Sequence, residues 1–76
     1  MKQLFRITIH WKHSTPNLEL RHLEGHVAKN TFKHLDHSMG NLDVMNLYAN
    51  NIDYLIDAGE ISYVEYKKDI IVEEGE

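Results

Sequence analysis

The sequence predicts an α+β domain in which a small antiparallel sheet packs on one main amphipathic helix. Residues 4–12 alternate between apolar and polar side chains, which is typical of a half-buried strand. Residues 40–59 repeat apolar side chains every three or four positions, which indicates a helix. Residues 61–72 are rich in β-branched and aromatic side chains, which favour a strand. The expected order is strand, strand, short helix, long helix, and a last strand or hairpin.

The size of the chain predicts a single small domain over residues 1–76, with a frayed tail at 73–76. A domain of this length buries only about 60% of the surface of its unfolded chain, so pairing into a homodimer would add useful buried area. The chain has no cysteine and no long apolar run, which excludes disulfides and thiolate metal sites and predicts no signal peptide and no membrane span. We expect a cytoplasmic protein that does not enter a membrane.

The first strand and the turn after it come from clear local patterns. Phe5, Ile7, Ile9 and Trp11 share one face of the predicted strand, and polar residues share the other. Residues 13–17 contain proline and asparagine, which favour a turn. The sequence therefore predicts a hairpin that leads into a second strand.

The second strand is expected over residues 18–28, with Gly25 as a bulge or kink inside it. A short helix over residues 31–38 would follow. The alternative is a helix over residues 26–37, because the apolar residues there also fit helical spacing.

The main helix is predicted over residues 40–59. Gly40 or Asn41 would cap its start, and Gly59 would end it. It would cover the apolar face of the sheet and leave the other sheet face open to solvent. Its apolar stripe would consist of Leu42, Met45, Tyr48, Ile52, Leu55 and Ile56. After this helix, residues 61–72 would form a strand or a hairpin that turns at residues 67–69.

Charge is unevenly distributed along the chain. Residues 1–38 contain six lysines and arginines against three acidic residues, whereas residues 39–76 contain two against nine. The two halves could simply attract each other in the fold, or the acidic half could meet a basic partner. For the second case, the predicted binding residues follow the polar face of the main helix. They are Asp43, Asn46, Asn50, Asp53, Asp57 and Glu60.

The six histidines form three close pairs in the first half of the chain, which raises the alternative of a metal site. Imidazole is a good ligand for zinc or nickel, and His22, Glu24 and His26 would share one face of an unkinked second strand. His10, on the open face of the first strand, would be a further ligand. A kink at Gly25 would separate these side chains.

The open sheet face could also contact nucleic acid through Arg6, His10 and Lys12, but two features oppose this. The aromatic residues lie on the other face, so no base-stacking surface accompanies the basic side chains. The chain as a whole is acidic, with a formal net charge of −4.

No motif of catalysis is present, neither a nucleophile elbow nor a glycine-rich phosphate loop. The chain is therefore expected to be no enzyme, to need no cofactor and to act as a protein-binding module. Its size and charge resemble those of small phage- or virus-encoded proteins that inhibit a host nucleic-acid enzyme. The alternative is a histidine-rich metal-binding or nucleic-acid-binding domain.

Overall fold

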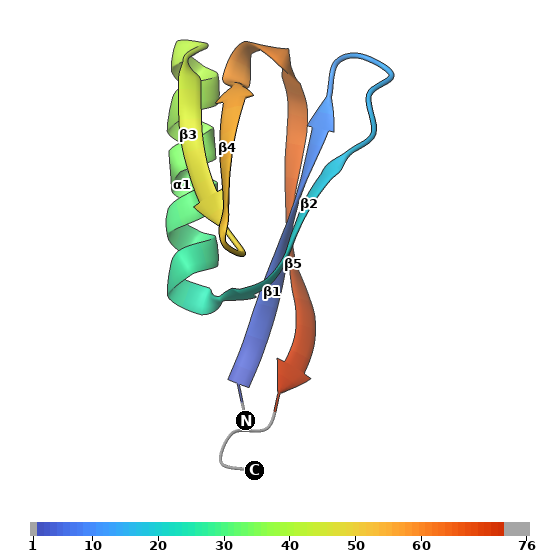
Figure 1. Cartoon of the computed structure of the whole chain (residues 1–76), viewed down its shortest axis with the longest axis vertical. Coiled ribbons are helices and arrows are strands. Elements are labelled where there is room, and N and C mark those ends of the chain that lie inside the picture. The colour runs from blue at the N-terminus through green and yellow to red at the C-terminus, as the bar shows by residue number, and fades with distance from the viewer. Residues whose placement is uncertain (1, 73–76) are drawn as a thin grey trace.

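The structure is a computed structural model that describes residues 2–72. Within this range the chain is α+β, with one α-helix and five strands in two antiparallel sheets (Figure 1). The elements in chain order are β1 (Lys2–Trp11), β2 (Leu18–Glu24), α1 (Gly25–Asn41), β3 (Val44–Ala49), β4 (Ile52–Asp57), the 3-10 turn η1 (Ala58–Glu60) and β5 (Ile61–Val72).

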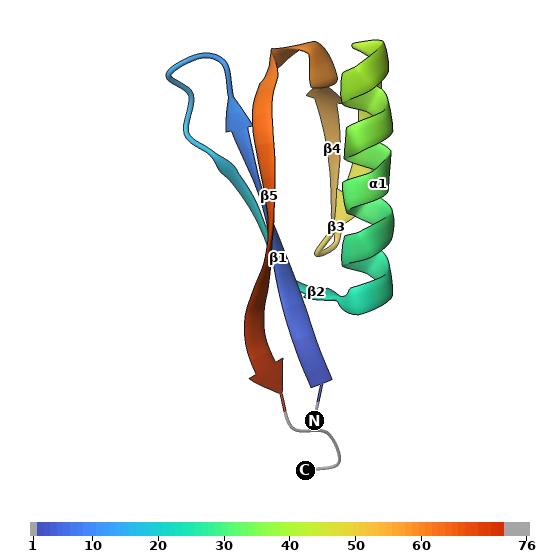
Figure 2. The same cartoon turned by 180° about the vertical axis from the view of Figure 1, so that it is seen from behind.

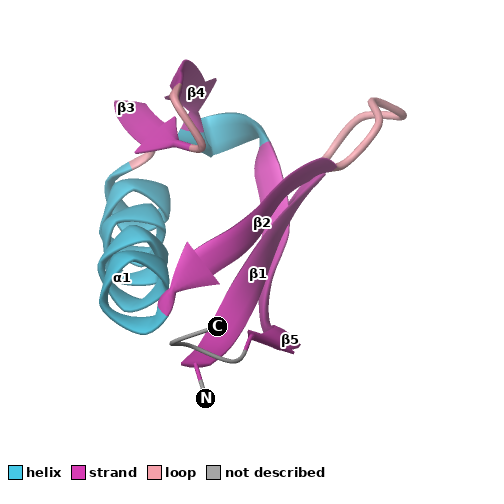
Figure 3. Cartoon of the chain, turned by 60° about the horizontal axis from the view of Figure 1, so that its bottom comes forward, coloured by secondary structure: helices cyan, strands magenta, loops and turns pink. Residues whose placement is uncertain are grey.

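The larger sheet has three strands in the order β2-β1-β5, with β1 in the middle. The smaller sheet is the hairpin of β3 and β4. Helix α1 and this hairpin stand side by side along the larger sheet (Figure 2), and both lie on one side of it (Figure 3). One apolar core lies between these three parts of the molecule.

The prediction for the first strand is confirmed. Ile7 and Ile9 are fully buried, and Phe5 and Trp11 are partly buried against the same core. The element that covers this face, however, is α1 together with the β3–β4 hairpin, and not a helix over residues 40–59.

The predicted helix over residues 40–59 is wrong, because this stretch forms the β3–β4 hairpin. Asn50 and Asn51 make the two-residue turn, with φ angles of 53° and 64°. A tight hairpin needs positive φ at both positions, and asparagine tolerates it better than most residues. The strands then alternate with a period of two. Their buried side chains are Met45, Leu47, Ala49 and Ile56.

The second strand is shorter than predicted and the first helix is longer. Strand β2 ends at Glu24, and Gly25 is the first residue of α1, not a bulge. The alternative helix over residues 26–37 is therefore closer to the structure than the short helix over 31–38. The face that α1 buries follows helical spacing but contains two polar residues. It consists of Ala28, Thr31, Leu35 and Ser38.

The helix ends at a residue with left-handed backbone. Leu42 has φ 55°, and its N–H donates to the carbonyl of Met39 at 3.3 Å. The next N–H, from Asp43, donates to the carbonyl of Ser38 at 3.1 Å. These two bonds satisfy carbonyls that the helix end would otherwise leave without partners.

The prediction of a strand after Gly59 is confirmed, and the alternative turn at residues 67–69 is not present, because β5 continues to Val72. The predicted tail at 73–76 lies outside the described residues.

Candidate protein-binding face

The outward side of the β3–β4 hairpin carries Leu55, which has the highest exposed fraction among the large apolar side chains of the described residues. Side chains that alternate with the buried ones point away from the core, and three of them are large and apolar. Leu55 is 80% exposed, Val44 61% and Tyr48 59%. We call this surface the outer hairpin face. It consists of Val44, Asn46, Tyr48, Asp53, Leu55 and Asp57.

Two carboxylates of the outer hairpin face lie on either side of Leu55 along β4. Asp53 pairs with Tyr48 across the hairpin, and Asp57 pairs with Val44. Asp57 also accepts the N–H of Gly59 at 3.0 Å. Neither carboxylate forms an ion pair within residues 2–72. The face thus combines exposed apolar area with negative charge that no described cation neutralises.

The six residues predicted to bind a partner are only partly together. Asn46, Asp53 and Asp57 share the outer hairpin face. Asp43 is exposed immediately before β3, so it borders this face.

The other two predicted residues make contacts inside the chain. The Asn50 Nδ2 atom donates to the carbonyl of Arg21 at 2.9 Å, which ties the tip of the hairpin to β2. One oxygen of Glu60 lies 2.6 Å from the Nε2 atom of His13. Their polar groups are therefore already used within the fold.

The predicted metal ligands around β2 do not share a strand face. His22 has φ 58° at a bulge in β2, and His26 lies on α1 because the strand ends at Glu24. One oxygen of Glu24 accepts from the Lys2 Nζ atom at 2.7 Å, and the other lies 3.7 Å from the Nδ1 atom of His26. Within residues 2–72 no three or more histidine and acidic side chains are arranged to hold a metal ion. A zinc or nickel site stays a prediction.

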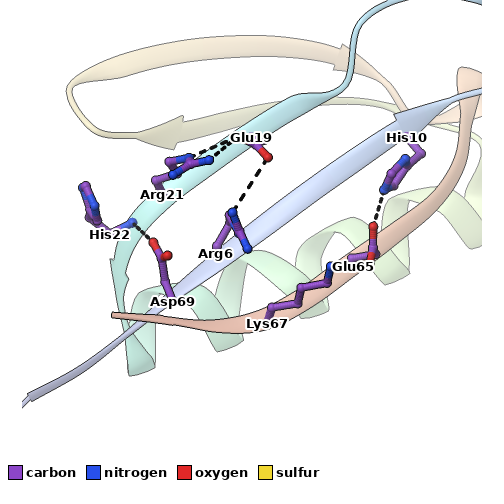
Figure 4. A network of polar contacts seen from close by, with 8 residues as sticks. All are labelled: Arg6, His10, Glu19, Arg21, His22, Glu65, Lys67 and Asp69. Atoms are coloured by element: carbon purple, nitrogen blue, oxygen red, sulfur yellow. Dashed lines mark hydrogen bonds and ion pairs between the residues drawn. The ribbon is translucent and has the colours of Figure 1, made fainter. Parts of the chain in front are cut away.

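The open face of the larger sheet carries a network of ion pairs (Figure 4). On the β2 side, Glu19 lies 3.0 Å from Arg21 and 4.0 Å from Arg6. On the β5 side, Glu65 accepts from Lys67 at 2.9 Å and also contacts His10, the fourth predicted metal ligand. The basic side chains proposed for nucleic acid are thus partly neutralised by carboxylates from neighbouring strands.

Two carboxylates in these contacts have shifted pKa values. The hydrogen bond from Lys67, followed by the contact with His10, lowers the pKa of Glu65 below its ordinary value of 4.5. The hydrogen bond from Lys2 lowers the pKa of Glu24 in the same direction. Both groups are therefore held in the charged form, as expected for a carboxylate beside an ammonium group.

Val44, Tyr48 and Leu55 are surface residues that were not predicted from the sequence. Tyr48 and Leu55 were expected in the buried stripe of a helix. The signal that could have found them is the Asn50-Asn51 pair, because a turn there makes the flanking residues alternate between core and solvent.

Comparison with protein-family models, with curated proteins and with solved structures gave no match. No helix among the described residues is both long and apolar enough to cross a membrane.

Proposed function

We propose that this chain is a non-catalytic protein-binding module that docks through its outer hairpin face. The observation that carries the proposal is the position of Leu55, which is 80% exposed between two carboxylates that lack an ion pair within residues 2–72. Single exposed apolar residues are common, but here Val44 and Tyr48 extend the apolar area across both strands. A surface of this kind fits a protein interface with an apolar centre and a polar rim.

The partner that this surface fits is a protein with an apolar hollow surrounded by lysine and arginine. Asp43, Asp53 and Asp57 would attract such a surface during encounter, and Leu55 would fill the hollow. A basic groove that ordinarily holds nucleic acid offers this charge, so we propose a nucleic-acid enzyme as the partner and inhibition by occupation of the groove as the activity. The open face of the larger sheet is less suited to this role, because Glu19 and Glu65 already pair with its basic side chains.

The test is a comparison of the wild-type chain with Leu55→Ser as immobilised baits in a cell lysate. A protein retained by the wild type and lost from the variant is then purified, and its affinity is measured. We expect Leu55→Ser to weaken binding about tenfold or more, because truncation of a central anchor has an effect of this size. The stability of the domain should be unchanged, because the side chain is 80% exposed.

Glu60→Gln is the control for the removal of a carboxylate, since the Glu60 carboxylate faces His13 and lies outside the outer hairpin face. We expect it to bind as the wild type does. Binding should also weaken as salt is raised, and Asp53→Asn together with Asp57→Asn should reduce the rate of association. Equal retention of every protein by the wild type and by Leu55→Ser would contradict the proposal.

A further inference from the structure

Besides the outer hairpin face, the molecule has a second surface to consider, the outer edge of β5 in the three-stranded sheet. This strand is 12 residues long and pairs on one side with β1, and no other described strand pairs with it. The opposite edge of the sheet, β2, is protected, because it is short, bulged at His22 and capped by the Asn50 side chain on the Arg21 carbonyl. Register shifts against β1 interrupt β5 between Ile61 and Tyr63 and between Lys68 and Ile71, so its regular part runs from Tyr63 to Lys68. The free edge of a regular strand is a ready template for pairing with another chain.

A groove lies beside this edge, between α1 and β5. Its lining residues include two aromatic side chains, Phe32 and Tyr66, which are 38% and 37% exposed. Their rings meet edge to face with centroids 5.3 Å apart. Lys29, Lys33 and Asp36 complete the lining. The apolar floor of this groove is thus bordered by charges of both signs.

We propose that a second copy of this chain occupies this edge and groove. The two copies of β5 pair antiparallel about a two-fold axis that passes between the two Tyr66 residues, so that the three-stranded sheets join into one continuous sheet. The outer hairpin face takes no part in this contact, so the proposal does not depend on the proposed function.

The charge pattern of β5 favours this register over the two adjacent ones. Directly opposite residues in an antiparallel pair point to the same face, so a symmetric pair must be centred on a residue. With the centre at Tyr66, Glu65 of each copy lies opposite Lys67 of the other. Centring on Glu65 would place the Glu65 carboxylates of the two copies opposite each other. Centring on Lys67 would place the two Lys67 side chains opposite each other. Opposite charges across a strand pair stabilise it and like charges destabilise it.

The same register accounts for Lys67 and Lys68, which would otherwise hinder the pairing of β5 with another strand. Lysine on an edge strand ordinarily discourages pairing, because a charge meets the incoming strand. Here Lys67 meets a carboxylate, and Lys68 lies opposite Val64 with no second cation against it. With this centre the regular stretch from Val64 to Lys68 pairs with the same stretch of the other copy.

The helix layer is complementary about the same axis. Because Phe32 contacts Tyr66, the axis passes close to the middle of α1, and the two helices lie antiparallel across the junction. Lys29 precedes Phe32 by three residues and Asp36 follows it by four, so each lysine falls near the aspartate of the other copy. The two grooves then face each other and bury their aromatic rings. This adds apolar burial that a 76-residue chain has in short supply.

The experiment is a charge exchange measured by sedimentation velocity. The wild type should sediment as a dimer that dissociates on dilution. Glu65→Lys alone and Lys67→Glu alone should each weaken self-association about tenfold or more, because each places like charges opposite one another twice. An equimolar mixture of these two variants should form a heterodimer, since every cross-strand pair then joins opposite charges. Recovery in the mixture cannot arise from repair of either fold, so it reports the contact itself.

Glu19→Lys, on the far edge of the sheet, is the control with the same change of charge, and it should leave the dimer intact. Circular dichroism of each variant verifies its fold. Leu55→Ser should also remain dimeric, which separates this interface from the outer hairpin face. The proposal is overturned by a monomeric wild type at high concentration, by single variants that dimerise as the wild type does, or by a mixture that stays monomeric.

Discussion

A few residues with positive φ angles lie where the chain bulges, turns or ends a helix. Among the described residues, four that are not glycine have positive φ, namely His22, Leu42, Asn50 and Asn51. His22 marks the bulge in β2, Leu42 ends α1, and the two asparagines make the β3–β4 turn. Asparagine occupies this region at low cost, whereas a leucine there is strained by its Cβ atom.

The two turn asparagines have different roles, which gives a prediction. Asn50→Ala should lower the free energy of unfolding by about 1–2 kcal/mol, because it strains the left-handed backbone and removes the bond to the Arg21 carbonyl. Asn51→Gly should have little effect or a small stabilising one, since glycine is favoured at this position of the turn. Urea unfolding measures both. A loss in Asn51→Gly as large as that in Asn50→Ala would count against the assigned turn.

At the scale of elements, the sequence predicts those whose period is unambiguous. The alternation in β1 extends over the whole strand and correctly predicts that Ile7 and Ile9 face the core. The signal for α1 is weak, because Thr31 and Ser38 occupy buried positions where an apolar stripe was expected. Only packing in the finished fold makes these two residues part of a buried face.

The β3–β4 hairpin shows why a candidate site can be predicted in part when its element is wrong. Residues four apart share a face both on a helix and on a strand, so Asp53 and Asp57 were expected together and do lie together. Leu55 lies two residues from each of them. On a helix this spacing points it away from the aspartates, whereas on a strand it shares their face. The apolar part of the site therefore could not be found without the correct element.

The end of α1 gives a prediction at this scale. Leu42 has left-handed backbone at the position where helices prefer glycine, and its side chain is 68% exposed. Leu42→Gly should raise the free energy of unfolding by about 1 kcal/mol, because strain is removed and little packing is lost. Leu42→Ala keeps the Cβ atom and is the matched control without this gain. Thermal or urea unfolding of the pair decides between relief of strain and a general effect of removing leucine.

Over the whole molecule, the basic and acidic halves of the sequence fold against each other. Glu65 and Glu60, from the acidic half, contact His10 and His13 from the basic half. This part of the charge asymmetry has an internal explanation. The ion pairs among residues 2–72 do not include the carboxylates of the outer hairpin face.

The shifted carboxylates make stability depend on pH. Glu65 and Glu24 have folded-state pKa values below the ordinary 4.5, so the charged form stabilises the fold. Their contribution is complete above about pH 4.5 and is lost as the pH falls through the lowered pKa values. Urea midpoints should therefore decrease through the acid range. The urea midpoint of Glu65→Gln should be lower than that of the wild type at neutral pH and should decrease less on acidification. A midpoint that changes with pH as much as that of the wild type would contradict this assignment.

The pairing of Lys2 with Val72 has a consequence for how the chain folds. Strand β1 is at the centre of the sheet, yet one of its two neighbours is the last strand of the described chain. Nearly the whole chain must be closed into a loop before this neighbour can join, and such distant contacts slow folding. During synthesis on the ribosome, β2 is the only described strand that can pair with β1 until β5 emerges, and a two-stranded hairpin is marginal in water. The finished sheet must therefore wait until β5 has left the exit tunnel.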